Sequence, residues 1–335
     1  MPELTSNSES TSNSATPAEA GMTGGAATSG DAERTVGSGV VPIVVRDFGG
    51  TGAPMLLLHG GGGNLVTMTA LAELFRPAYR VVTVDLRGHG RSGDGPWEWD
   101  AVLADLDTVV DELALDRPAV VGLSLGGMIA TLWAARHPDC RGAVNLDGNP
   151  PPSRPDDLAG LEPDRAVAEL ARLREVFAGM SAGMARPLPA DQVAAAIDGW
   201  RALARRYGAD EEVWAEAFRR NLVPVDGDAS RLRPGAELAE ELRLAMEALD
   251  LVPAYRDVRC PLLLVLATED LPEQRPFHDL YAAHRRRIQE RLATVRDNPW
   301  LKVVRLDGAS HAMVAERPRQ VAELVTDFLA SRRSG

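Results

Sequence analysis

The chain has few cysteines and no long hydrophobic segment. Its 335 residues include two cysteines, Cys140 and Cys260, which lie far apart and lack the spacing of a metal site. This argues against a disulfide framework and a cysteine-based metal centre, and we expect buried free thiols. No apolar run approaches the roughly 20 residues that cross a bilayer, so no membrane partner is expected.

The chain also has fewer basic than acidic residues, so its formal net charge is −12 and its pI is about 5.1. An acidic surface repels polyanions, which argues against nucleic acid as a partner. The chain begins Met-Pro-Glu-Leu and has neither a basic start nor an apolar segment there. We therefore expect no signal peptide and a cytoplasmic protein.

Residues 1–36 lack aromatic side chains and are rich in Ser, Thr, Ala, Gly and Glu. Such a segment buries too little apolar surface to offset its chain entropy, so a disordered N-terminal arm is expected. The remaining chain is ordinary for a globular protein, with 45% hydrophobic and 25% charged residues overall. A chain of this length can bury a large core.

The most informative stretch is residues 117–138. A short apolar strand there ends in Gly-Leu-Ser-Leu-Gly at 122–126, and a helical pattern follows until Pro138. Strand, sharp turn and helix form the context in which G-x-S-x-G is a nucleophile elbow. In an elbow, Gly122 and Gly126 leave room where a side chain would strike the neighbouring strand or helix, and Ser124 carries the nucleophile.

Apolar strands alternate with helical patterns on both sides of this stretch. Alternation of this kind predicts an α/β protein with a mostly parallel, doubly wound sheet covered by helices on both faces. The expected strands are an edge strand or hairpin arm at 40–48 and buried strands at 54–58, 80–86, 119–121, 143–146, 261–267 and 301–306. Residues 37–149 and 251–335 should form this core, and residues 150–250 a helical insertion.

Polar residues follow several of the expected strands, and parallel strands end at one edge of a sheet. Ser124, Asp270 and His311 each come after an apolar run. A serine hydroxyl is a weak nucleophile that needs a base, histidine can supply it near neutral pH, and a carboxylate orients the imidazole. We expect these three side chains to converge as a catalytic triad.

A glycine-rich loop, His-Gly-Gly-Gly-Gly, follows the strand at 54–58. It lacks the Lys-Ser/Thr of a phosphate-binding P-loop, which sets that alternative aside. Backbone N–H groups of such a loop can stabilise a tetrahedral oxyanion together with the residue after the nucleophile. The expected oxyanion hole is the N–H of Gly61, or alternatively of Gly60, with that of Leu125.

Four motifs together resemble the α/β-hydrolase superfamily. They are His-Gly-Gly-Gly at 59–62, Asp-Leu-Arg-Gly-His-Gly-Arg-Ser at 85–92, Gly-Leu-Ser-Leu-Gly-Gly at 122–127 and Gly-Ala-Ser-His at 308–311. The resemblance covers about 40–148 and 251–333 and implies that residues 150–250 form a helical cap. Its order of triad residues, serine, acid and histidine, is the one found here. The elbow is similar to that of carboxylesterases and enol-lactonases, whereas haloalkane dehalogenases and epoxide hydrolases have aspartate there.

Two other acids compete with Asp270 for the triad. Glu269 is adjacent, and Asp147 ends the strand after the elbow helix, where some superfamily members place the acid. The superfamily usually has glycine where this chain has Ala267, which weakens the case for Asp270. We favour Asp270 and keep Asp147 as the alternative.

The other five histidines have structural interpretations. His59 should order the glycine loop and His89 should tie down its own loop, whereas His137, His278 and His284 lie on expected helices and should be exposed. The run of three arginines at 285–287 is expected to be a solvated helix face.

These observations predict a serine hydrolase that cleaves a small-molecule ester or lactone through an acyl-enzyme, with no metal or organic cofactor. An acyltransferase or C–C bond hydrolase on the same triad is one alternative. A ligand-binding receptor of this fold with little turnover is another. Substrate size depends on how residues 150–250 pack, and the sequence assigns no oligomeric state.

Overall fold

The computed structural model describes residues 32–37, 41–225 and 227–331, so most of the expected arm at 1–36 lies outside the described residues. None of the helices within these ranges is long and apolar enough to cross a membrane. The strands are β1 (Ala32–Val36), β2 (Ile43–Gly49), β3 (Ala53–Leu58), β4 (Tyr79–Val84), β5 (Ala119–Leu123), β6 (Ala143–Leu146), β7 (Leu188–Pro189), β8 (Leu222–Val225), β9 (Ala229–Leu232), β10 (Leu262–Ala267) and β11 (Leu301–Leu306). The α-helices are α1 (Thr69–Phe75), α2 (Trp99–Glu112), α3 (Leu125–Arg136), α4 (Pro163–Met184), α5 (Ala190–Tyr207), α6 (Glu211–Arg220), α7 (Ala236–Ala248), α8 (Val252–Asp257), α9 (His278–Ala293), α10 (Met313–Glu316) and α11 (Pro318–Ser331), and the short 3₁₀ turns are η1 (Leu65–Met68), η2 (Pro155–Asp157) and η3 (Pro272–Phe277).

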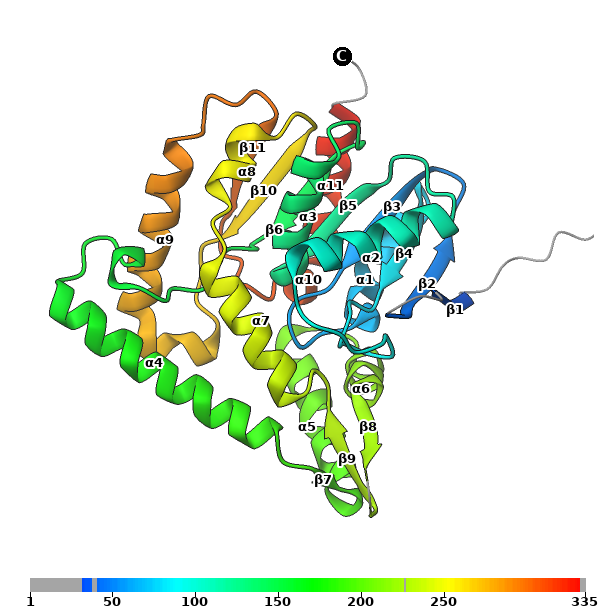
Figure 1. Ribbon diagram of the computed structural model, residues 1–335, viewed down its shortest axis with the longest axis vertical. Helices are drawn as coiled ribbons and strands as arrows, with labels where there is room; N and C mark the ends of the chain where they lie inside the picture. Colours follow the sequence, from blue (N-terminus) through cyan, green and yellow to red (C-terminus); the bar gives the residue numbers. More distant parts are fainter. Residues whose placement is uncertain (1–31, 38–40, 226, 332–335) are drawn as a thin grey trace, which may run out of the picture.

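The core is an eight-stranded sheet in the order β1-β2-β4-β3-β5-β6-β10-β11. The six strands from β4 to β11 in that order run parallel, and β1 and β2 add an antiparallel hairpin at one edge. This confirms the predicted fold class and brings the carboxyl ends of six strands to one edge of the sheet (Figure 1).

Helices cover both faces of the sheet, as the continuous apolar strands require. In β3, Leu56 and Leu58 pack with the helices α2, α3 and α8 on one face. Met55 and Leu57 point the opposite way and pack with α1, α10 and α11. Because successive side chains alternate between faces, a strand buried on both sides must be apolar throughout.

Part of the expected disordered arm is instead a strand. Residues 32–36 form β1, which pairs with β2 in antiparallel register from Ala32↔Asp47 to Val36↔Ile43. Its side chains are mostly exposed, so hydrophobicity gave no signal. Backbone pairing and the ion pairs of Glu33 with Arg46, Arg91 and Arg220 hold it, and these interactions depend on residues distant in the sequence.

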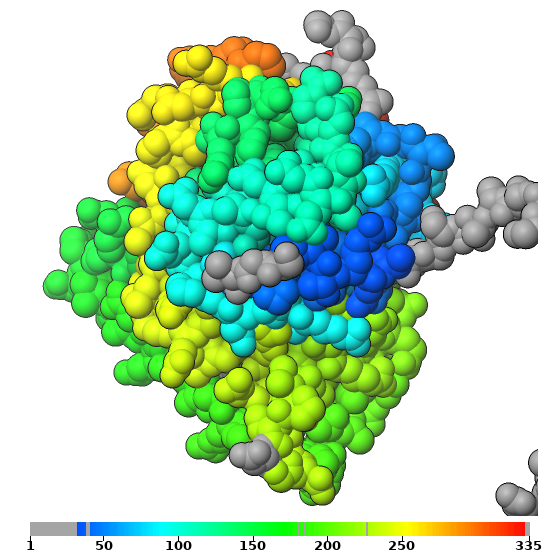
Figure 2. Space-filling model, turned by 45° about the vertical axis from the view of Figure 1, so that its right-hand side comes forward, coloured from blue at the N-terminus to red at the C-terminus, as the bar shows by residue number. Residues whose placement is uncertain are grey.

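The segment between β6 and α8 forms a cap, which we define by α4 to α7. Figure 1 shows these helices at one end of the molecule, and in Figure 2 they form the green and yellow-green lower body. Besides its four helices, the cap contains a three-stranded antiparallel sheet in the order β7-β9-β8, which the expected helical insertion did not include. These strands have two to four residues each, too short for a clear alternating pattern.

A buried ion pair attaches the cap to the core. Arg220, at the end of α6, donates from Nε to Asp85 Oδ2 at 2.8 Å, and its Nη1 donates to Glu33 at 2.9 Å. The side chains of Arg220 and Asp85 are 2% and 0% exposed. Asp85 also accepts the N–H groups of Leu65 and Arg91 at 2.7 and 2.8 Å, so one carboxylate joins the cap to two core loops.

Arg220→Met is expected to lower the free energy of unfolding by about 3–5 kcal/mol, because it leaves the buried Asp85 carboxylate without its cation. Denaturant unfolding of the purified variant measures this loss. Arg219→Met is the matched control, since Arg219 is a neighbouring, exposed side chain whose carboxylate partner lies 4.0 Å away. Its change should stay within roughly 0.5 kcal/mol. Equal losses in both variants would contradict the anchoring role of Arg220.

Candidate active site

Ser124 lies in a strained turn between β5 and α3. Its backbone has φ 54° and ψ −116°, a conformation that non-glycine residues adopt at a cost of about 1–3 kcal/mol. The turn can close because the flanking residues Gly122 and Gly126 have no side chain. A Cβ on Gly122 would lie 2.0 Å from the carbonyl oxygen of Gly126, and one on Gly126 would lie 2.4 Å from that of Leu58. The strand, strained serine and helix are those of a nucleophile elbow.

Asp147 follows β6, the neighbour of β5 in the sheet. Because Leu123 pairs with Leu146, the serine and the aspartate are the next residues of two adjacent parallel strands. Asp147 also has a positive φ, 52°, in the left-handed region that is uncommon for non-glycine residues. Its Oδ1 accepts the N–H of Ala267 at 3.0 Å, which fixes the carboxylate and directs Oδ2 elsewhere.

Oδ2 of Asp147 is hydrogen-bonded to His311 Nδ1 at 2.7 Å. His311 lies in the loop after β11, and its side chain is 36% exposed. Ser124, Asp147 and His311 line one cavity of about 240 Å³. Within the described residues no hydrogen bond joins Ser124 Oγ to His311. The two side chains line the same cavity without this bond, and catalytic hydrogen bonds commonly form or tighten only when substrate binds.

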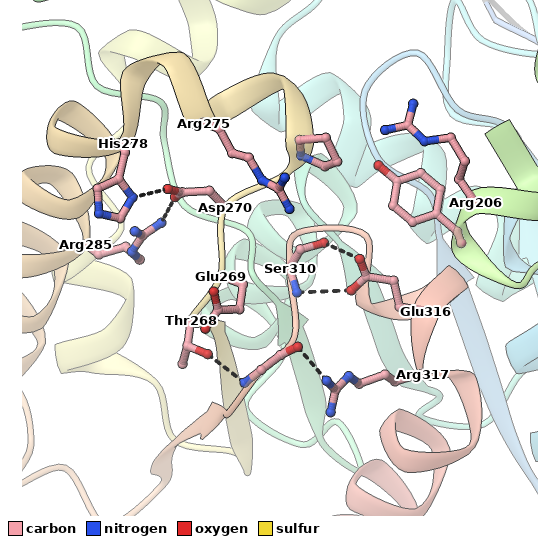
Figure 3. A pocket seen from close by; sticks show the side chains of 13 residues that line it. Arg206, Thr268, Glu269, Asp270, Arg275, His278, Arg285, Ser310, Glu316 and Arg317 are labelled. Atoms are coloured by element: carbon pink, nitrogen blue, oxygen red, sulfur yellow. Dashed lines mark hydrogen bonds and ion pairs between the residues drawn. The ribbon is translucent and has the colours of Figure 1, made fainter.

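The preferred acid, Asp270, does not reach His311. It forms ion pairs with Arg285 and His278 on α9 (Figure 3). The N–H groups of Thr268 and Glu269 both donate to the Ala309 carbonyl at 3.0 Å, and these long-range hydrogen bonds turn the chain after β10. Glu269, the other rival, is exposed and does not contact His311 either. The histidine is partnered by the alternative acid, Asp147.

The glycine loop lies directly against Ser124. A Cβ on Gly60 would lie 3.3 Å from Ser124 Cβ and 3.9 Å from its Oγ. In the part of the chain that the structure describes, the N–H groups of Gly60, Gly61 and Leu125 donate to no protein acceptor. Leu125 opens α3, where the first N–H groups of a helix lack intrahelical partners. These donors are available to an oxyanion formed at Ser124.

His59 and His89 are buried and structural, as expected. The Nε2 of His59 accepts the Leu86 N–H at 3.1 Å, so its Nδ1 carries the proton and donates to the Gly60 carbonyl at 2.7 Å. Burial lowers the pKa of His59 to about 4 and that of His89 to about 3. Both rings are therefore neutral at pH 7, and His59 orders the glycine loop.

Cap and core both contribute to the cavity wall. Phe177 of α4 and Met246 of α7 come from the cap, and the core adds polar residues from the loops and α9. The sequence analysis assigned no individual cap residue to the cavity and missed the polar set. Besides Ser124, Asp147 and His311, the polar residues are Asn149, Glu269, Gln274, Tyr281, His284 and Arg285. About half of the wall is therefore polar or charged, so the cavity offers a small molecule both apolar surface and hydrogen-bonding groups.

His284 was expected to be exposed, and this was wrong. Its Nδ1 lies 3.2 Å from the Asp157 carbonyl oxygen and its Nε2 lies 3.1 Å from that of Pro150. Burial is the main effect on its pKa and lowers it. The ring thus holds the first residues of the cap segment against α9. Of the other two, His278 is exposed and His137 is half-buried, stacked on Trp133.

The prediction that the three arginines at 285–287 form a solvated helix face is wrong for Arg285. Arg285 pairs with Asp270 and lines the cavity, whereas Arg287 pairs with Glu290 on the helix surface.

The His311–Asp147 pair predicts a pH profile. Burial lowers the pKa of His311, but the hydrogen bond and negative charge of Asp147 outweigh it, and the net effect raises the pKa above its ordinary 6.5. A general base must be neutral, so kcat/KM should rise with pH through this raised value. In Asp147→Asn the charge is gone and burial remains, so the acid limb of the residual activity should move to lower pH. Rates of ester hydrolysis measured from about pH 5 to 9 give the acid limb of the parent protein and that of the variant. An unmoved limb would assign the titration to another group.

Comparison with known proteins places this chain in a family. The model of the alpha/beta hydrolase family matches residues 55–324. A curated relative, 2-(acetamidomethylene)succinate hydrolase of Mesorhizobium japonicum, is 28% identical over 301 residues, covering 88% of this chain and 94% of the relative. The crystal structure of E-2-(acetamidomethylene)succinate hydrolase superposes with a TM-score of 0.65 at 24% identity, over 90% of this chain and all of that one.

A second relative has a different activity. It is the pimeloyl-[acyl-carrier protein] methyl ester esterase of Yersinia pseudotuberculosis, 25% identical over 283 residues and covering 82% of this chain and 92% of the relative. The two relatives share hydrolysis and differ in substrate.

Proposed function

The chain belongs to the alpha/beta hydrolase family, and from this premise we propose that it is a serine hydrolase that cleaves a carboxylic ester or lactone. The observation that carries the proposal is the placement of a strained Ser124 and a hydrogen-bonded His311–Asp147 pair in the wall of one cavity. The esterase among the relatives supports the ester class.

In the proposed reaction, Ser124 Oγ attacks the substrate carbonyl carbon and His311 takes the hydroxyl proton. Because Nδ1 is bonded to Asp147, the proton goes to Nε2, and the carboxylate stabilises the imidazolium that forms. The N–H groups of Leu125 and of Gly60 or Gly61 stabilise the oxyanion. His311 then returns the proton to the leaving alcohol, which leaves an acyl-enzyme.

Water completes the cycle. His311 removes a proton from water, the hydroxide attacks the acyl carbonyl, and the proton returns to Ser124 Oγ as the acid departs. These steps use only side chains and backbone N–H groups of this chain. A lactone follows the same path, with the alcohol remaining attached to the released acid.

Labelling with a fluorophosphonate tests the proposal without knowledge of the natural substrate. An activated serine displaces fluoride from this probe, so the intact mass should rise by one phosphonyl group. Ser124→Ala should take up none, and Ser230→Ala, which changes a cap serine on β9, should be labelled like the parent protein. Absence of labelling in the parent protein would favour the receptor alternative, which needs no activated nucleophile.

A further inference from the structure

A second and larger cavity, about 650 Å³, lies beside the catalytic one; we call it the outer chamber. Its walls come from the end of α5 in the cap, from the loops after β10 and β11, from η3 and α9, and from the end of α10 with Arg317 after it (Figure 3). Glu269 and Arg285 line both cavities, so the outer chamber adjoins the cavity of Ser124 and His311.

Four arginines and three carboxylates line the outer chamber. Two of the carboxylates are engaged within the wall. Asp270 pairs with Arg285 and His278, and Glu316 accepts the hydroxyl and N–H of Ser310. Glu269 is the wall carboxylate that has no hydrogen-bond or ion-pair partner among the described residues.

Three of the four guanidinium groups have no carboxylate partner in the described part of the chain. Arg206 of α5 and Arg275 of η3 make no hydrogen bond or ion pair there, and Figure 3 shows the Arg275 guanidinium directed toward the middle of the chamber. Arg317 donates to the carbonyls of Asp307 and Gly308 and to the amide of Gln320. The whole chain has a net charge of −12, whereas this wall has more arginines than carboxylates. Its local charge is therefore opposite in sign to that of the chain.

We propose that the outer chamber binds an anionic group, a carboxylate or a phosphate, at the far end of a substrate whose scissile carbonyl lies at Ser124. This inference rests on the proposed function and adds the substrate class to it. Guanidinium groups bind carboxylates and phosphates through paired N–H donors. Their placement also attracts an anion to a protein that would otherwise repel it.

Matched p-nitrophenyl esters test the chamber. The hexanoate ends in a methyl group, the adipate monoester carries a carboxylate at that position, and the 6-phosphooxyhexanoate carries a phosphate. The parent protein should prefer one or both anionic esters by about tenfold in kcat/KM, and the comparison of the two identifies the anion. Arg206→Gln and Arg275→Gln should each remove most of this preference through KM and leave hexanoate hydrolysis unchanged.

Arg205→Gln is the control, because Arg205 neighbours Arg206 on α5 but pairs with Glu211 outside the chamber. It should keep the full preference. The proposal would be overturned if the chamber variants lost kcat/KM for all three esters to the same extent. It would also be overturned if the preference for anionic esters persisted in the double variant Arg206→Gln/Arg275→Gln.

Calorimetry with adipate and with inorganic phosphate separates this inference from the proposed function. If no ester is hydrolysed but either anion binds the parent protein and not the double variant, the chamber stands and the hydrolytic function fails. If esters are hydrolysed and neither anion binds, the chamber fails alone.

An independent observation concerns the two cysteines. Cys140 and Cys260 precede β6 and β10, which are adjacent parallel strands. Both thiols are buried, at 6% and 1% exposure, and Cys140 Sγ lies 2.9 Å from Cys260 Sγ. Both residues line a cavity of about 330 Å³, which gives a small reagent a route to them.

We propose that this pair is an oxidation site at which a peroxide closes a disulfide. The Cys140 thiolate attacks a peroxide oxygen, giving a sulfenic acid and water from hydrogen peroxide. The Cys260 sulfur then attacks the sulfenic sulfur and expels a second water. Two thiols are oxidised and one peroxide is reduced. The hydrogen bond between the two thiols lowers the pKa of Cys140, which makes Cys140 the attacking thiol.

Titration of thiols after peroxide treatment and unfolding tests this site. Both thiols should be lost together with two hydrogens from the intact mass. Dithiothreitol should restore them, and the oxidised form should unfold at a higher temperature because the closed loop contains the whole cap. Cys260→Ser should instead carry Cys140 to the sulfinic acid. The same sulfinic product in the parent protein would overturn the proposal.

Discussion

Replacing Ser124 with alanine is expected to lower kcat for p-nitrophenyl acetate by about 10⁶-fold. The hydroxyl is the atom that forms the acyl-enzyme, and removal of the nucleophile from a comparable triad costs an effect of this size. The residual rate should come from the oxyanion donors and from binding alone. Steady-state hydrolysis followed at the absorbance of p-nitrophenolate measures the loss.

The strained backbone provides a second readout that separates catalysis from folding. Alanine at position 124 keeps the positive φ of 54° and should leave thermal unfolding unchanged. Glycine accepts that conformation, so Ser124→Gly should be equally inactive but more stable by about 1 kcal/mol. If Ser124→Ala retained the parental rate, another group would have to be the nucleophile, and the proposed function would be lost.

Replacing Asp147 with asparagine is expected to lower kcat by about 10⁴-fold. The amide cannot stabilise the imidazolium, and it favours the wrong tautomer of His311. Asparagine is the suitable substitute because it tolerates the left-handed backbone at this position, where φ is 52°, and its oxygen can still accept the Ala267 N–H. Kinetics should show the loss in kcat, with circular dichroism and unfolding temperature near those of the parent protein.

Asp270→Asn is the matched control, because it makes the same chemical change in the carboxylate that sequence order favoured. Asp270 pairs with Arg285 and His278 and does not contact His311, so kcat toward a neutral ester should keep its order of magnitude. The opposite outcome, a large loss at Asp270 and a small one at Asp147, would show that the loop after β10 rearranges to bring Asp270 to the histidine.

The sequence by itself determined the sheet and the position of the serine, because both depend on local patterns. Strands buried on both faces must be continuously apolar, and a turn as tight as that at Ser124 requires glycine at 122 and 126. The same local logic predicted that His59 orders the glycine loop. The exposed strand β1 and the short strands of the cap have no such side-chain pattern and form through backbone pairing, so the sequence analysis missed them.

Only the tertiary structure decided which carboxylate partners His311. Asp147 and Asp270 both follow apolar strands, and the order of residues along the chain fits either one. The choice depends on the register of β5 against β6 and on where the chain turns after β10, which long-range backbone hydrogen bonds set. The gathering of arginines 206, 275 and 317 in one chamber wall likewise depends on how the cap and the loops meet. Charges a hundred residues apart become neighbours only when the chain has folded.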